Sequence, residues 1–108
     1  MEYKELYADL TSKLEKEIPI KAFPIRELVQ IFREKGNPIT LKSNVTIISV
    51  FNSGDISGIL CTLKIDNKEG HACSLTHLLF ETNFKLYKEI CDYQKKRHKR
   101  IEQLNRMK

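Results

Sequence analysis

The sequence has no tryptophan, few glycines and prolines, and no apolar run that approaches the roughly 20 residues of a membrane span. Its first five residues, MEYKE, also lack the basic and apolar segments of a secretory signal peptide. These absences predict an intracellular, cytoplasmic protein without membrane association. The three cysteines, Cys61, Cys73 and Cys91, are odd in number and form no C-x-x-C motif, so we expect buried free thiols and no disulfide framework.

Motifs of the common enzyme classes are also missing. The sequence contains no Walker-type loop, no G-x-G-x-x-G, no H-E-x-x-H and no paired catalytic carboxylates. His71, Cys73 and His77 would share one face of a strand, but about 20 Å would then separate the two histidines, too far for one metal ion. The segment from Ser74 to His77 lacks the strained turn of a serine nucleophile. We therefore expect no catalytic residues, no metal, no cofactor and no enzymatic activity.

What remains is an ordinary globular composition. The residues are 41% hydrophobic and 31% charged, a composition typical of a folded globular domain. A chain of 108 residues is long enough for one small core and too short for two. We therefore treat residues 1–108 as a single small domain.

Two helices are predicted in the first third of the chain. Apolar residues at three- and four-residue spacing predict an amphipathic helix over residues 3–18, which Pro19 ends. Pro24 suits the first position of a second helix, because it has a fixed φ and no N–H. Gly36 and Pro38 would end that second helix.

The middle of the chain predicts strands. β-Branched residues dominate residues 45–51 and 56–66, and the turn clusters at 52–55 and 67–70 each contain a glycine. Two hairpins would therefore join three antiparallel strands that end near Phe80. With a final helix after them, the fold class is α+β and the predicted order is α-α-β-β-β-α.

If both turns are four residues long, both faces of this sheet are substantially apolar. One face would carry Ile48, Ile59, Cys61, Leu63, Ile65, Ala72, Leu78 and Phe80. The other face would carry Ile47, Phe51, Leu60, Leu75 and Leu79. Such a sheet must be covered twice, by helices on both sides or by helices and a second subunit, so a homodimer is one expectation.

The basic residues are concentrated at the end of the chain. Residues 85–108 contain nine Lys or Arg against three acids, a net charge of +6, whereas the other 84 residues sum to −1. We expect this segment to form a long helix that begins at Thr82 or Asn83, either of which can cap it. Such a helix would be about 36 Å long, so its end could extend past a domain of this size.

A stripe of positive charge would follow one side of this helix. At about 100° per residue, the stripe comprises Lys88, Lys95, Lys99 and Arg106. Gln94, Arg97 and His98 stand where the opposite, apolar stripe should continue, which leaves a gap in it.

Three interpretations of the basic stripe stay open, one of which is contact with an acidic protein partner or a membrane surface. A rigid cationic helix can follow phosphates without reading base sequence. Alternatively, Asp92 could pair with Lys88, and Glu102 with Arg106, which would make the stripe a partly self-neutralised, solvated face. Tyr93, at the edge of the apolar stripe, is the one aromatic side chain that we would test for stacking on a base, although packing against Arg97 or the sheet would also explain it.

We therefore expect a small, non-catalytic protein that binds the phosphate backbone of nucleic acid. The predicted contact residues are Lys88, Lys95, Lys96, Arg97, Lys99, Arg100 and Arg106. The alternative is a protein–protein interaction module, such as a small regulator or inhibitor, that uses the helix or the second apolar sheet face and could be a homodimer.

Overall fold

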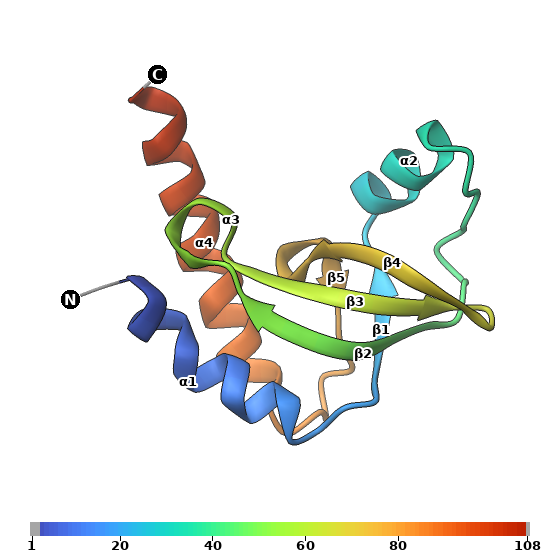
Figure 1. Ribbon diagram of the computed structural model, residues 1–108, viewed down its shortest axis with the longest axis horizontal. Helices are drawn as coiled ribbons and strands as arrows, with labels where there is room; N and C mark the ends of the chain where they lie inside the picture. The colour runs from blue at the N-terminus through green and yellow to red at the C-terminus, as the bar shows by residue number, and fades with distance from the viewer. Residues whose placement is uncertain (1–2, 108) are drawn as a thin grey trace.

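The order of elements along the chain starts with a helix and ends with a long helix, with an antiparallel sheet between them (Figure 1). A computed structural model describes the backbone of residues 3–107 and the side chains of residues 7–107. The elements are α1 (Tyr3–Glu15), β1 (Ile20–Pro24), α2 (Arg26–Glu34), β2 (Val45–Asn52), α3 (Gly54–Ser57), β3 (Ile59–Ile65), β4 (Lys68–Ser74), a 3-10 turn (Leu75–His77), β5 (Leu78–Leu79) and α4 (Tyr87–Arg106). None of the helices in the described residues combines the length and the hydrophobicity that a membrane span requires.

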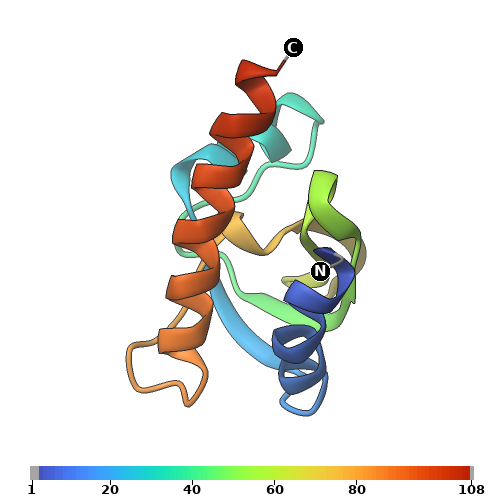
Figure 2. The same ribbon diagram turned by 90° about the vertical axis from the view of Figure 1, so that its left-hand side faces the viewer.

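One five-stranded sheet, in the order β4-β3-β2-β1-β5, supports the helices. Figure 2 shows α4 and α1 with the strands between and behind them. The helices contribute buried apolar side chains at helical spacing: Tyr7 and Leu14 from α1, Leu28 and Phe32 from α2, and Ile90 and Tyr93 from α4. The rings of Tyr7 and Tyr93 meet edge to face, with centroids 5.3 Å apart, so α1 and α4 join directly across the core.

The α+β class is confirmed, and β2, β3 and β4 form an antiparallel meander as predicted, but two further strands, β1 and β5, extend the sheet to five. The segment between Pro19 and Pro24, predicted as a connection, forms strand β1 and separates α1 from α2. Ile20, Ala22 and Pro24 point inward in alternation, the period of a strand. Pro24 is the last residue of β1 and not the first of α2, because its ring suits an end position where no N–H is needed.

A bulge in β2 places nearly all buried strand residues on one face. Ile47 pairs with Leu63, and the next pair along β2 is Ser49 with Thr62, so Ile48 is an extra residue. Residues on either side of the bulge, such as Ile47 and Val50, can therefore both be buried. The two predicted faces are wrong here, since Ile47 lies with Leu63 on the core side.

The opposite face of the sheet is mixed and not apolar throughout. Thr62 and Lys64 lie there, next to the half-buried Leu60 and to Phe51, which is 45% exposed. A face of this composition can remain in contact with water. The structure therefore does not require the second covering layer that we expected on this face.

The two turns between the strands also differ from the prediction. After β2 the chain makes the short helix α3, so β3 begins at Ile59 and not at Ile56. Between β3 and β4 only Asp66 and Asn67 are unpaired, with φ of 47° and 76°. Two consecutive positive φ values are typical of a type I′ hairpin, whose twist matches that of the flanking strands.

The third predicted strand ends earlier than expected, although β5 returns the chain to the sheet, and the last helix begins later. β4 ends at Ser74, whose Oγ accepts a hydrogen bond from the Thr76 amide and caps the 3-10 turn. α4 begins at Tyr87, and neither Thr82 nor Asn83 caps it. The residues before α4 form successive turns, in which the ring of Phe84 stacks on that of Phe80 with centroids 6.1 Å apart. This contact holds the chain where the predicted helix would have started.

Candidate functional site

The outward face of α4 carries the predicted basic stripe. Lys88, Lys95, Lys99 and Arg106 are all exposed, and Lys96 is exposed beside them. The opposite side of the helix enters the core through Ile90 and Tyr93. Figure 1 shows that the C-terminal end of α4 extends beyond the sheet. The stripe therefore lies on the solvent-exposed side of a helix whose other side is anchored in the core.

Few of these charges are neutralised by neighbours. Arg106 pairs with Glu102, with nitrogen and oxygen 3.6 Å apart, as the self-pairing interpretation predicts. The second predicted pair is not formed, because no ion pair joins Lys88 to Asp92 within residues 7–107. In the same part of the chain, Lys95, Lys96 and Lys99 also form no ion pair. Four lysines of α4 thus remain available to an anionic partner.

Arg97 lies on the inner side of α4 and is 2% exposed. Its Nη1 donates to the Tyr7 hydroxyl, at 3.3 Å, and to the backbone carbonyl of Asp55, and its Nη2 donates to the carbonyl of Ile56. These contacts explain the gap in the apolar stripe, since a buried guanidinium is tolerated where acceptors surround it. The expected phosphate contact by Arg97 does not fit this burial.

Arg100 faces α3 and is 24% exposed. Its Nε donates to one carboxylate oxygen of Asp55 at 2.8 Å, and its Nη2 donates to the other at 2.5 Å. The hydrogen bond from Arg100 holds the pKa of Asp55 below its ordinary value, its positive charge acts in the same direction, and burial opposes both. Arg100 is therefore engaged within the protein, although part of it reaches solvent.

Gly58 completes this junction between α3 and α4. It ends α3 with φ 69° and ψ −146°, a region that only glycine adopts readily. A methyl group there would lie 2.5 Å from the Tyr93 hydroxyl and 2.8 Å from Nε of Arg97. The Tyr93 hydroxyl accepts a hydrogen bond from the Ile59 amide at 2.8 Å, so the absence of a side chain lets α4 approach the backbone.

We call Tyr93, Arg97, Arg100, Asp55, Gly58 and Ile59 the α3–α4 junction. Sequence reasoning missed Asp55 and Gly58, because residues 52–55 have the composition of an ordinary turn. The local signal was the interruption of the apolar stripe at Arg97, which indicates a buried polar contact but not the segment that Arg97 meets. Tyr93 belongs to the core, is 6% exposed and has a bonded hydroxyl, which favours the packing interpretation over stacking on a base.

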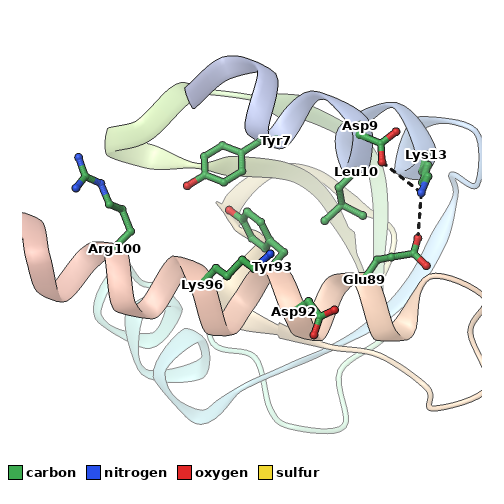
Figure 3. A pocket seen from close by; sticks show the side chains of 9 residues that line it. All are labelled: Tyr7, Asp9, Leu10, Lys13, Glu89, Asp92, Tyr93, Lys96 and Arg100. Atoms are coloured by element: carbon green, nitrogen blue, oxygen red, sulfur yellow. Dashed lines mark ion pairs between the residues drawn. The ribbon is translucent and has the colours of Figure 1, made fainter. Parts of the chain in front are cut away.

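A cavity of about 310 Å³ lies between α1 and α4 (Figure 3). Tyr7, Leu10 and Tyr93 form its apolar part, and charged residues surround it. The ammonium of Lys13 pairs with Asp9 at 3.3 Å and with Glu89 at 3.6 Å, which links the two helices and raises the pKa of Lys13. Acidic and basic groups both line the cavity, so its charge selects no particular ligand.

His71, Cys73 and His77, predicted to share one strand, lie in three different environments in the structure. Cys73 faces the core opposite Cys61, His71 packs on the ring of Phe32, and His77 lies in the 3-10 turn and not in a strand. Burial raises the pKa of the Cys73 thiol to about 12, and the three cysteines are free. Among the described residues, no group of three His, Cys, Asp or Glu could hold a metal ion.

The pairing of Asp55 with Arg100 predicts a pH dependence of stability. Because the folded-state pKa of Asp55 is lowered, its contribution is present above the ordinary value of 3.8 and is lost as the pH falls through the folded-state pKa. Asp55→Asn should lower the free energy of unfolding at pH 7 by about 1 kcal/mol, given partial exposure of the pair. Urea unfolding at pH 7, 5 and 3 should show this difference shrinking below pH 3.8.

Asp92→Asn is the matched control for this pH series, since Asp92 is exposed and forms no ion pair within residues 7–107. Its effect on stability should be small at each pH. A difference between wild type and Asp55→Asn that stays constant from pH 7 to pH 3 would contradict the assigned role of the carboxylate.

No protein-family model, no curated protein and no solved structure matches this chain.

Proposed function

We propose that the protein binds nucleic acid through the phosphate backbone, along the outward face of α4. The observation that supports this proposal is the set of four exposed lysines without ion pairs within residues 7–107, namely Lys88, Lys95, Lys96 and Lys99. Arg106 extends the same face, with its partial neutralisation by Glu102. Positive charges gathered on one face of a helix gain affinity for a polyanion by releasing its counterions.

The spacing of these residues suits a linear array of phosphates. Lys95 and Lys99 are one helical turn apart, about 6 Å along the axis, and the rise from Lys88 to Arg106 is about 27 Å. Lysine ammonium groups act as mobile point charges and do not read base edges in a fixed geometry. The proposed binding is therefore independent of base sequence.

The contact set differs from the predicted seven residues. Arg97 is withdrawn into the core, and Arg100 is held by Asp55, so neither is required by the proposal. The remaining contacts are Lys88, Lys95, Lys96, Lys99 and Arg106. Five phosphate contacts give a slope of log affinity against log salt of about −4.5 on duplex DNA.

Fluorescence anisotropy across a salt series tests the proposal. With Lys95, Lys96 and Lys99 all changed to Gln, the slope on a short DNA duplex should fall in magnitude by about 2.7, because three phosphate contacts are lost. The matched control removes the same charge elsewhere, through Lys35→Gln, Lys42→Gln and Lys68→Gln, all exposed and outside α4. This control should keep the wild-type slope within about one unit.

Equal slopes for the two triple variants would refute the assignment to α4, and absence of wild-type binding at low salt would refute the function itself. In the second case the alternative is a protein-interaction module. The exposed Phe51, next to Leu60 on the open sheet face, is the observation that favours it. Sedimentation velocity of wild type and Phe51→Glu would then test whether this face mediates self-association.

A further inference from the structure

Asp55 binds Arg100 in the geometry that a phosphate would use. Two nitrogens of the guanidinium meet two oxygens of the carboxylate, at 2.8 Å and 2.5 Å. Arginine recognises phosphate through the same parallel pair of charge-assisted hydrogen bonds. Asp55 thus occupies the position of an anionic ligand on the one arginine of α4 that is neither buried nor at the end of the helix.

The residues around this pair favour a polyanion that lies along α4 over a single carboxylate. Lys96 precedes Arg100 by one helical turn, and Lys99 is its neighbour in the chain; both are exposed. Arg100 and Asp55 are 24% and 17% exposed, in contrast to 2% for Arg97. A phosphate that follows the lysines can therefore reach the Arg100 guanidinium without opening the core.

We infer that Asp55 is an internal competitor for phosphate, which nucleic acid displaces from Arg100 on binding. This inference rests on the proposed function. It adds Arg100 to the residues that contact phosphate, because Arg100 becomes available when the phosphate replaces Asp55. Only a partner with a phosphate near Lys96 and Lys99 can replace the carboxylate, whereas small monovalent anions lack the neighbouring contacts. Asp55 therefore suppresses weak anion binding at this position.

The fold permits this exchange without loss of α3. Arg97 holds α3 through the backbone carbonyls of Asp55 and Ile56, and the Gly54 carbonyl accepts the Gly58 amide at 2.7 Å. None of these bonds uses the carboxylate of Asp55. Replacement of the carboxylate by a phosphate at Arg100 therefore leaves these bonds between α3 and α4 in place.

Four variants measured by anisotropy across the salt series separate this competition from a general charge effect. They are Asp55→Asn, Asp92→Asn, Arg100→Gln and the double variant Asp55→Asn with Arg100→Gln. Asp55→Asn should bind a DNA duplex about tenfold more tightly and steepen the slope by about 0.9, the value of one further phosphate contact. Asp92→Asn removes the same charge from α4, so it should gain only about two- to threefold.

The gain from Asp55→Asn should disappear when Arg100 is also changed to Gln, and the gain from Asp92→Asn serves as the reference for charge alone. An equal gain with and without Arg100 would overturn the inference while leaving the proposed function intact. A wild type that fails to bind would overturn both.

A measurement on the wild type avoids any effect of the substitutions on folding. The Arg100 Nε–H signal in a nitrogen-15 NMR spectrum, assigned by its absence in Arg100→Gln, reports the acceptor of that bond. Titration with a 12-base-pair DNA duplex should shift this signal together with the Lys96 and Lys99 amides. An unmoved Arg100 signal at saturation would show that Asp55 keeps its partner and would overturn the exchange.

Discussion

Gly58→Ala is expected to lower the free energy of unfolding by about 3 to 5 kcal/mol, a large part of the stability of a small domain. Two costs add at this position. An alanine at φ 69° and ψ −146° is strained by about 1 to 3 kcal/mol. Its methyl group would also displace the Tyr93 hydroxyl and the Arg97 guanidinium, and the broken hydrogen bonds cost about 1 to 3 kcal/mol more.

Gly36→Ala separates these two costs. Gly36 also has a positive φ, 80°, but apart from Gly36 and its two chain neighbours no atom of the described residues lies within 4 Å of the position its methyl group would take. This variant should lose only about 1 kcal/mol, from backbone strain alone. Urea unfolding measures both changes. Equal losses for the two glycine variants would show that close approach of α4 to Gly58 contributes nothing to stability.

The basic face of α4 could be predicted from the sequence because helical periodicity is a local property. Lys88, Lys95 and Lys99 fall on one side of a helix whatever the rest of the chain does, and the structure exposes all three. The predicted start of this helix was wrong for the opposite reason. Phe84 packs on Phe80, a contact that the capping potential of Thr82 and Asn83 does not encode.

Strand β1 could not be predicted because it depends on partners distant in the chain. Ile20 pairs with Ile47, and Pro24 pairs with Leu78. The local sequence instead indicates boundaries, because Pro19 precedes the five residues and Pro24 is the last of them. The bulge at Ile48 is equally non-local: it places Ile47, which precedes it, on the opposite face from the predicted one, whereas Phe51, which follows it, lies beside Leu60 as predicted.

The junction of α3 with α4 shows which part of a site a sequence can indicate. A charged residue in an apolar stripe signals a buried polar contact, and Arg97 gave that signal. Its acceptors, the carbonyls of Asp55 and Ile56, belong to the short helix α3, about forty residues earlier in the chain. Backbone carbonyls occur at every residue, so no composition rule identifies which two of them an arginine will meet.

Replacing Arg97 with methionine is the second substitution for which we expect a large effect. Methionine keeps the apolar stem but cannot donate to the carbonyls of Asp55 and Ile56 or to the Tyr7 hydroxyl. Charge-assisted hydrogen bonds stabilise a fold by about 1.5 to 3 kcal/mol each. Part of their loss is offset because methionine, unlike the guanidinium, has no charge that must be removed from water on folding. The free energy of unfolding should fall by about 3 kcal/mol, which lowers the melting temperature by roughly 10 to 20 °C.

Lys99→Met is the matched control, because it places the same side chain at an exposed position two residues further along α4. It should change the free energy of unfolding by less than about 0.5 kcal/mol. Amide hydrogen exchange gives a local test, since α3 and the Ile59 amide should lose protection in Arg97→Met before β2 and the rest of β3 do. Equal melting temperatures for the two methionine variants would mean that the bonds from Arg97 do not stabilise α3, and the same finding would remove the support that lets Arg100 exchange partners.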